Sequence, residues 1–391
     1  MSARLSVVLP LAAVTGVGML ATDLYLPALP QLPAALGGTI PLAQATLAAF
    51  TLALALSQLV WGYAADRFGA RIVLAIALAL QVAAGLACAL APTLPLLIAA
   101  RAVQGFGVGA AAVVVPGVIR RRFGDADTVR AMSWLAICES VIPAAAPVAG
   151  AFLLQVAGWQ ASFWITTAVA AVVSPLALAQ VPQAARRHDD PARNGYRALL
   201  GDPVYLGYAL GHALCFAALV GFVASAPQVV EIWLGAAPMT FALLQACGVG
   251  AFVGTAALAG RLTTRFGVDR MIVAGILIQL VATLVFVGLA LADRRSLVGV
   301  VAGWVLFCGA LGLRGPATMT RALAVDPGLV GRAAGLMMFA ALAITAAATQ
   351  AVAPFLHRGL LPAAAMCLAF TVASGAVMAW GIAARRRRGS G

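Results

Sequence analysis

Residues 62–71 read GYAADRFGAR, and residues 260–270 read GRLTTRFGVDR. Four pairs of identical residues recur at a constant offset of 198 positions, close to half of the 391-residue chain: Gly62 and Gly260, Arg67 and Arg265, Phe68 and Phe266, Gly69 and Gly267. A repeat at this distance indicates that the chain consists of two homologous halves.

The amino-acid composition shows whether the two halves are soluble or lie in a membrane. Hydrophobic residues make up 63% of the chain and charged residues only 9%, whereas soluble domains carry about 25% charged residues. Many of the apolar runs are close to the ~20 residues that cross a bilayer as a helix. The strands of a transmembrane β-barrel alternate apolar and polar residues over about ten positions, and these runs show no such alternation. The sequence therefore predicts an all-α membrane protein.

The apolar runs divide the chain into twelve expected transmembrane spans. They lie at residues 5–30, 42–63, 72–91, 95–119, 130–155, 160–181, 203–226, 239–261, 271–291, 297–322, 332–356 and 361–383. The longest polar stretch falls between the sixth and seventh spans. We expect an N-terminal six-helix bundle at residues 1–181, a cytoplasmic linker at 182–202, and a C-terminal six-helix bundle with a basic cytoplasmic tail at 203–391.

The net charge of +13 indicates the orientation of the chain in the membrane rather than binding to nucleic acid. All 25 basic residues other than histidine are arginines. If both termini are cytoplasmic, twenty of them lie on the cytoplasmic side and three outside, which agrees with the positive-inside rule. A Walker A phosphate loop needs a lysine, so the chain carries no ATP-binding motif of that kind. Its six cysteines lie inside apolar spans without paired spacing and suggest neither disulfides nor a zinc site.

Several motifs resemble those of the major facilitator superfamily. GYAADRFGAR resembles its motif A, RAVQGFGVGA (101–110) its motif B, and PAAAPVAGAF (143–152) its antiporter motif C, in which Ala146 and Ala151 replace expected glycines. The stretches TDLYLPALP (22–30) and SAPQVVEIWLGAAPMTFALL (225–244) are similar to the bicyclomycin and chloramphenicol resistance branch, Bcr/CflA.

This resemblance implies two pseudo-symmetric six-helix bundles that work by alternating access. It implies a proton-coupled efflux antiporter for small amphipathic compounds, phenicol-like or bicyclomycin-like, in the bacterial inner membrane. The expected partners are the substrate, protons and lipid, with a monomeric chain, no nucleic acid and no cofactor. The alternative is a proton-coupled exporter or importer of an endogenous metabolite. We expect no enzyme, because three scattered histidines and no nucleophile grouping offer no catalytic cluster.

Ionisable residues inside spans are functional candidates because each costs at least about 2.5–3.5 kcal/mol to insert. Asp23 and Arg101 lie at similar depth, roughly 10 Å from the outer ends of spans one and four. Either they form a static ion pair, or the Asp23 carboxyl binds and releases a proton as the cavity changes sides. Glu139 lies near the middle of span five. The resemblance supports proton-coupling roles for Asp23 and Arg101, and Glu139 is a second candidate.

The other candidate residues concern the cavity and the gates. Arg314 is expected to extend to the cytoplasmic interface. The expected cavity residues are Tyr25, Gln58, Gln104, His212, Phe216, Phe222, Gln245, Trp304 and Met337. The expected gating residues are Gly62, Asp66, Arg67, Gly69 and Arg71 of motif A, where the glycines should allow tight helix ends, and Pro143, Pro147 and Gly150 of span five. Because Thr264 replaces Asp66 in the second copy, the charged latch is expected in the N-terminal half only.

Overall fold

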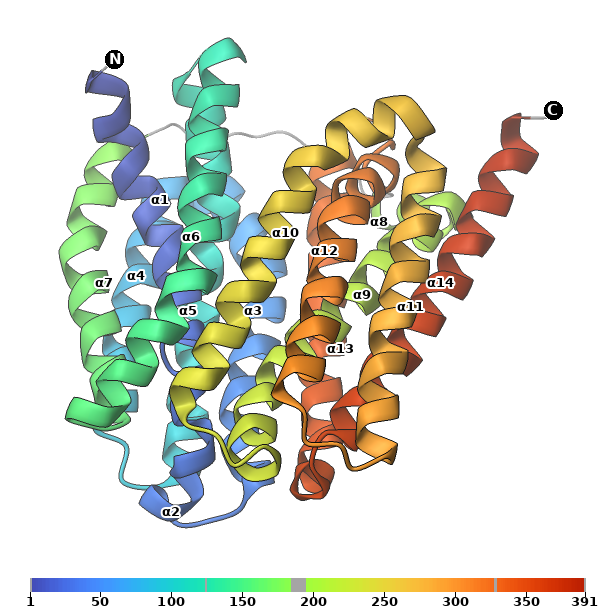
Figure 1. Ribbon diagram of the computed structural model, residues 1–391. Coiled ribbons are helices and arrows are strands. Elements are labelled where there is room, and N and C mark those ends of the chain that lie inside the picture. Colours follow the sequence, from blue (N-terminus) through green and yellow to red (C-terminus); the bar gives the residue numbers. More distant parts are fainter. Residues whose placement is uncertain (1, 124, 184–194, 327–328, 390–391) are drawn as a thin grey trace. The chain divides into compact units, whose positions relative to one another are not determined.

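The computed structural model describes residues 2–123, 125–183, 195–326 and 329–389. These residues contain twelve helices long and apolar enough to cross a membrane, which confirms the predicted fold class and span number. They belong to α1 (Ser2–Asp23), α3 (Ile40–Phe68), α4 (Ala70–Ala89), α5 (Leu94–Arg122), α6 (Asp125–Ala157), α7 (Gln160–Gln180), α9 (Pro203–Gln228), α10 (Pro238–Phe266), α11 (Val268–Leu291), α12 (Leu297–Ala322), α13 (Val330–Val352) and α14 (Leu361–Gly389) (Figure 1).

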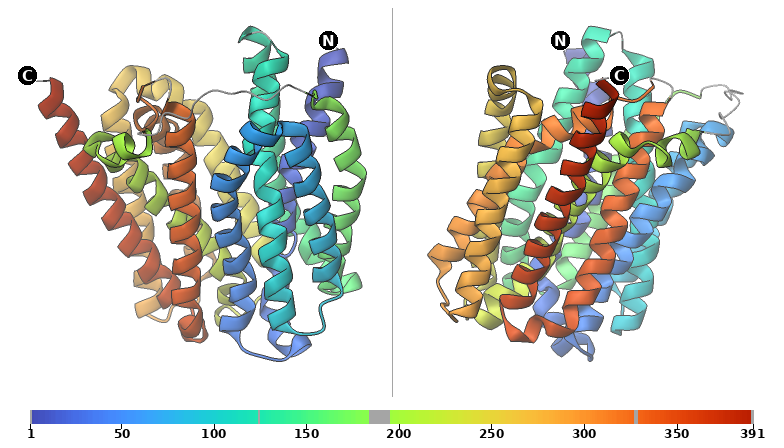
Figure 2. Two further views of the ribbon diagram at one scale, coloured as in Figure 1. Left: turned by 180° about the vertical axis from the view of Figure 1, so that it is seen from behind. Right: turned by 90° about the vertical axis from the view of Figure 1, so that its right-hand side faces the viewer.

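The chain folds as two compact units, an N-terminal unit of Met1–Asp189 and a C-terminal unit of Asp190–Gly391. Helices at corresponding positions along the two units form the same packed pairs. In the N-terminal unit α5 packs on α3 and α4, α7 on α1 and α4, and α6 on α1; in the C-terminal unit α12 packs on α10 and α11, α14 on α9 and α11, and α13 on α9. The repeated motif therefore belongs to a repeated packing scheme, which Figure 2 shows from two further sides.

The expected linker carries one short helix. Residues 184–194 lie outside the described residues, and α8 (Gly195–Leu200) follows them. In the C-terminal unit α8 packs against α9 and α13. The residue bounds of the two bundles at 181 and 203 stay a prediction.

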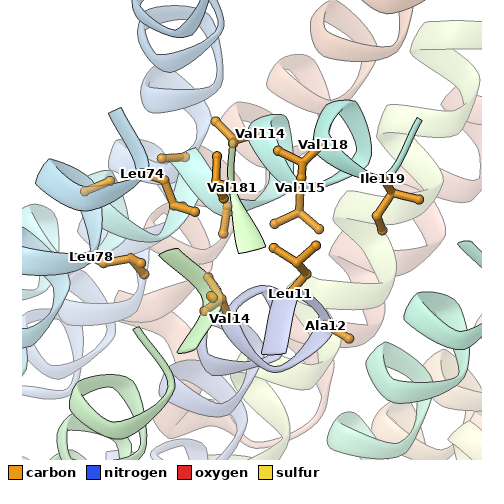
Figure 3. Close-up of a cluster of buried hydrophobic side chains, with 14 of the residues drawn as sticks. Leu11, Ala12, Val14, Leu74, Leu78, Val114, Val115, Val118, Ile119 and Val181 are labelled. Carbon is orange, nitrogen blue, oxygen red and sulfur yellow. The ribbon is translucent and has the colours of Figure 1, made fainter. Parts of the chain in front are cut away.

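The core of the N-terminal unit joins its six long helices, α1 and α3 to α7. Leu11 and Val14 of α1 face Leu74 of α4 and Val115 of α5 (Figure 3). The same cluster extends to Leu78, Val114, Val118, Ile119 and Val181. Because lipid is as apolar as these side chains, close packing rather than escape from water holds the helices together.

The glycine that ends each copy of motif A has the same conformation in both units. Gly69 has φ 91° and ψ 144°, and Gly267 has φ 88° and ψ 151°. Only glycine adopts this backbone region without strain. Each glycine donates its N–H to the carbonyl four residues earlier, at 3.0 Å for Ala65 and 2.9 Å for Thr263. It thereby ends one helix and starts the next, which explains why the sequence repeats it.

The other repeated glycine of motif A does not end a helix. Gly62 lies inside α3, and a Cβ there would meet only Val113 at 3.8 Å, an ordinary contact. Gly260 lies inside α10, and a Cβ there would meet no atom within 4 Å. The expectation that Gly62 allows a tight helix end is therefore wrong, and only Gly69 has that role.

Two of the spans show a change of helix type, the first within its predicted bounds and the seventh just beyond them. In the first, α1 ends at Asp23 and the 3₁₀ helix η1 (Leu26–Gln31) follows, with Pro27 in its first turn. The short helix α2 (Leu32–Leu36) continues it. The seventh span is predicted to end at residue 226, but α9 continues to Gln228 and passes into the π-helical turn η2 (Val229–Trp233), which begins two residues after Pro227. Proline lacks the N–H that a continuous α-helix needs, which accounts for both changes.

A similar change ends the eleventh span. The 3₁₀ helix η4 (Ala353–Arg358) follows α13, with a proline in its first turn. The chain reverses at Gly359, which has φ 83°, and enters α14.

The two glycines of the second motif copy give opposite predictions. Gly267→Ala should destabilise the protein by about 1–3 kcal/mol because alanine is strained at this φ and ψ. Gly260→Ala should be neutral or stabilise by up to about 1 kcal/mol, because it replaces a helical glycine where nothing crowds the new methyl group. Thermal unfolding midpoints in detergent would measure both. Equal midpoints for the two variants would contradict the assigned backbone roles.

Candidate functional site

Arg101 lies at the centre of a fully buried cluster in the N-terminal unit. It is the eighth residue of α5 and has no exposed surface. Its Cζ lies 4.1 Å from the ring centroid of Phe50 on α3, 4.9 Å from that of Tyr25 after α1, and 5.7 Å from that of Phe163 on α7. A desolvated cation over an aromatic face gains about 2 kcal/mol or more. We call Arg101 and these three rings the arginine cage.

Hydrogen bonds fix the orientation of the guanidinium. Its Nη1 donates to the backbone carbonyl of Ala21 at 3.1 Å and to Gln104 Oε1 at 2.7 Å. The Tyr25 hydroxyl lies 2.6 Å from that of Thr46, which donates in turn to the Ala43 carbonyl. The cage therefore ties α1, α3, α5 and α7 together. Two donors, Nε and Nη2 of Arg101, are buried without a hydrogen-bond partner.

Phe50 and Phe163 are not among the sequence candidates. In the structure Gly105 of motif B lies against Phe50. A Cβ on Gly105 would come within 2.2 Å of the Phe50 carbonyl oxygen, so α5 and α3 touch at their backbones there. Aromatic residues in a span face lipid as often as a neighbour, so the sequence alone does not distinguish these two.

Asp23 lies beside this cluster but forms no ion pair with it. It is the last residue of α1, two positions after the carbonyl that Arg101 binds, and its side chain is half-buried. Within the described part of the chain no ion pair joins Asp23 to Arg101. The static pair between the two residues is therefore not formed in this structure. The two unused donors of Arg101 remain available to a carboxylate.

The motif C helix approaches the same end of α1. A Cβ on Gly150 of α6 would come within 2.2 Å of the Leu24 carbonyl oxygen, directly after Asp23. Only a glycine permits this close approach. Pro147 and Pro143 lie inside α6 one and two turns earlier. Glu139, also on α6, is half-buried and lies near the Thr15 side chain of α1.

The expected cavity residues of the N-terminal unit differ in exposure. Gln104 is buried and accepts from Arg101 and, at 3.8 Å, from the Cys88 thiol. Tyr25 is buried in the arginine cage, whereas Gln58 of α3 is half-buried. The structure thus brings Tyr25 and Gln104 into one cluster with Arg101, and their role towards a substrate stays a prediction.

An aromatic stack occupies the corresponding place in the C-terminal unit. Trp304, the eighth residue of α12, stacks with Phe222 of α9 at 4.7 Å between centroids and with Phe307 at 5.9 Å. Phe222 also stacks with Phe286 of α11 at 4.7 Å. Gly248 of α10 leaves room for the indole, since a Cβ there would lie 2.1 Å from Trp304 Nε1.

The remaining cavity candidates lie on three helices of the same unit. Gln245 of α10 is buried, and Met337 of α13 belongs to a buried cluster with Tyr205 and Tyr208. His212 and Phe216 of α9 are half-buried, with ring centroids 6.5 Å apart. Cavity-lining roles for these residues stay predictions.

Arg314 does not extend to the interface as expected. Only 1% of it is exposed, and its Nη2 donates to Ser374 Oγ of α14 at 2.9 Å. The inward orientation of this side chain has a local cause. Gly275 of α11 faces the side chain, and a Cβ there would lie 2.6 Å from Arg314 Cβ.

The two copies of motif A carry their charges differently. In the first, Arg67 and Arg71 are exposed, Arg67 Nη1 donates to the Tyr63 hydroxyl at 3.1 Å, and the Asp66 side chain lies outside the described residues. In the second, Asp269 of α11 pairs with Arg321 of α12 at 3.3 Å and with Arg385 of α14. The second copy therefore also carries charged pairs, although only the N-terminal half is expected to have a charged latch; a latch role for either copy stays a prediction. In the second copy the acidic residue, Asp269, lies two residues after Gly267, whereas Asp66 of the first copy lies three residues before Gly69.

No group of three or more His, Cys, Asp or Glu among the described residues could hold a metal ion. The described cysteines are free thiols.

Comparison with known proteins identifies the family. A sequence profile of the Major Facilitator Superfamily matches residues 11–349. The chain is 28% identical over 249 residues to the uncharacterized MFS-type transporter YdgK of Bacillus subtilis, covering 62% of each chain. It is 27% identical over 231 residues to the multidrug resistance protein MdtL of Escherichia coli, covering 58% of this chain and 59% of that one. It is 25% identical over 279 residues to the bicyclomycin resistance protein homolog of Haemophilus influenzae, covering 69% and 70%.

These matches span about three fifths of the length of the first two relatives, so they bear on family more than on substrate. Solved structures agree over nearly the whole fold. A bacterial homolog of the human lysosomal transporter Spinster superposes with a TM-score of 0.75 at 16% identity, covering 98% of this chain and 97% of that one. A D-xylose–proton symporter gives a TM-score of 0.74 at 16% identity, covering 94% and 96%. The chain belongs to the Major Facilitator Superfamily.

Proposed function

We propose that this transporter is a proton-coupled antiporter that exports small amphipathic compounds, phenicol-like or bicyclomycin-like, by alternating access. It works in the bacterial inner membrane with both termini in the cytoplasm, in keeping with the distribution of its arginines. The names of the resistance relatives support the substrate class. The cargo, protons and lipid are its partners, and it works as a monomer.

One observation supports the proton coupling: a carboxyl group lies at the end of α1, two residues after the carbonyl to which Arg101 donates, and Arg101 has unused donors. A helix C-terminus carries partial negative charge, so the dipole of α1 opposes ionisation of Asp23. The unused donors of Arg101, Nε and Nη2, would favour ionisation if α1 brought the carboxyl within their reach. A small movement of α1 against α5 therefore changes the balance between the protonated and the ionised carboxyl, which is what an exchanger requires.

Glu139 supplies a second carboxyl on the helix that touches α1. Because Gly150 of α6 packs on the carbonyl of Leu24, a shift of α6 moves the segment that carries Asp23. The prolines of α6 leave carbonyls without N–H partners and make such a shift easier. We propose that Asp23 and Glu139 both exchange protons, with Asp23 essential.

The alternative cargo is an endogenous metabolite, moved in or out. Everted membrane vesicles separate these cases, because only an exported exchange substrate dissipates an imposed proton gradient when it is added outside. A phenicol or a bicyclomycin-like compound that leaves the gradient unchanged would contradict the drug-efflux proposal.

Asp23→Asn should abolish proton-driven efflux, because the amide cannot bind and release a proton. Gradient dissipation in everted vesicles should fall to the level of vesicles without the protein. Exchange of labelled for unlabelled substrate across the membrane, which needs no net proton movement, should persist.

Asp293→Asn is the matched control. Asp293 is an exposed carboxylate with φ 46°, a conformation that asparagine tolerates, and an amide oxygen can still accept from Trp233. This variant should dissipate the gradient as the wild type does. Active efflux by Asp23→Asn at the wild-type rate would exclude Asp23 as the coupling group.

Phe50→Leu removes the ring closest to Arg101 while keeping an apolar side chain. We expect a loss of about 2 kcal/mol in stability from the missing cation–π contact, and a reduced rate of efflux because the guanidinium is no longer held in place. Phe152→Leu on the exposed face of α6 is the control and should change neither. Thermal unfolding in detergent and vesicle transport measure the two effects. If Phe50→Leu behaves like Phe152→Leu, the arginine cage does not position Arg101.

A further inference from the structure

Arg314 is a second buried cation. It lies in the C-terminal unit, and the N-terminal unit has no cation at the corresponding position. Arg314 is the eighteenth residue of α12, and the eighteenth residue of α5 is Ala111. Gly275, which faces it, is the eighth residue of α11, and the eighth residue of α4 is Ala77. The repeated packing scheme therefore does not by itself produce this site. The C-terminal unit has both the cation and the glycine that makes room for it.

The side chain is held at the junction of three helices. Arg314 Nη2 donates to Ser374 Oγ, and Ser374 Oγ donates to the Gly211 carbonyl of α9 at 2.7 Å. The single hydroxyl proton of Ser374 is used by that carbonyl, so its oxygen is left to accept from the guanidinium. This chain of hydrogen bonds fixes the guanidinium between α9, α12 and α14.

Its positive charge is not neutralised by the protein. No carboxylate of the described residues pairs with Arg314, and its Nη1 is buried without a hydrogen-bond partner. His212 of α9 lies near Arg314 and supplies no negative charge. An arginine side chain keeps its charge in proteins. A buried charge without a counter-charge is strongly unfavourable, so a negative group from outside the chain would stabilise the guanidinium.

We propose that Arg314 binds a monoanionic group in the C-terminal unit, with His212 beside it. The ligand chemistry is a single negative charge with oxygen or halide acceptors, supplied either by a free small anion such as chloride or by a carboxylate on the cargo. Binding of the anion does not depend on the proposed function. Recognition of a carboxylate on an exported compound does rest on that function.

The first test measures binding on the purified full chain in detergent. Chloride, benzoate and the neutral isostere benzamide are titrated at constant ionic strength, with sulfate as the balancing salt, while the thermal unfolding midpoint is followed. A ligand that binds the folded protein raises the midpoint in a saturable manner. We expect saturation with benzoate, chloride or both, and no shift with benzamide. A shift with chloride alone identifies a free anion, and one with benzoate shows that the site accepts an organic carboxylate.

Three variants assign the effect. Arg314→Gln should abolish the anion shift, whereas Arg294→Gln in an exposed position should keep it. Ser374→Ala keeps the cation and frees Nη2, so it should retain or strengthen the shift even if Arg314→Gln does not fold. The proposal is overturned if the wild type shows no saturable shift with either anion, if Arg314→Gln responds like the wild type, or if Ser374→Ala loses the response.

The second test concerns the cargo. In everted vesicles Arg314→Gln should export carboxylate-bearing compounds at least about tenfold more slowly, the loss expected for about 1.4 kcal/mol of binding, and neutral phenicols at the wild-type rate. Equal export of both classes would exclude recognition of a cargo carboxylate at Arg314. A wild type that exports neither class would instead refute the proposed function, and the binding titration would still decide whether the anion site exists.

Discussion

The guanidinium of Arg101 is a permanent charge inside a helix bundle, and the N-terminal unit is arranged around it. Three aromatic rings, one backbone carbonyl and one glutamine side chain surround the group, and they come from α1, α3, α5 and α7 or the turns beside them. None of these partners is a carboxylate, so the charge is stabilised by dipoles and aromatic faces and is not cancelled. In the proposed mechanism Asp23 therefore gains or loses a proton without breaking an existing ion pair.

The two units share a packing scheme and differ in the chemistry placed on it. Arg101 and Trp304 are each the eighth residue of their helix, and Phe50 and Gly248 are each the eleventh residue of the helix packed against it. The residues at these paired positions therefore differ in kind between the two units. A ring on α3 covers a cation on α5, whereas a glycine on α10 makes room for an indole on α12. In the C-terminal unit the cation lies ten residues further along α12, at Arg314.

The sequence is most informative where a single residue type satisfies a geometric requirement. The glycine at positions 69 and 267 is predictable because few other residues adopt its backbone conformation, and span number follows from the length of apolar runs. The prediction for Gly62 is wrong because a repeated glycine need not end a helix, and this one lies within α3. Asp269 escapes prediction because its partners, Arg321 and Arg385, are 52 and 116 positions away along the chain.

Arg314 shows the limit of sequence-based inference most clearly. An arginine late in an inward-running span normally reaches the interface. Here Gly275 makes room for the side chain and Ser374 accepts from it, on two other helices, and no local pattern around position 314 indicates either residue. The sequence specifies that the helices exist and in which order, but not which faces they present to each other.

In the proposed mechanism, transport depends on a carboxyl group in the N-terminal unit that exchanges its proton for cargo. The most direct measurement is the release of protons when substrate is added to the purified protein in weakly buffered detergent, followed with a pH-sensitive dye. We expect release that saturates with substrate in the wild type and is lost when residue 23 cannot ionise. Substrate binding without proton release, or release of the same size in Asp23→Asn, would contradict this mechanism.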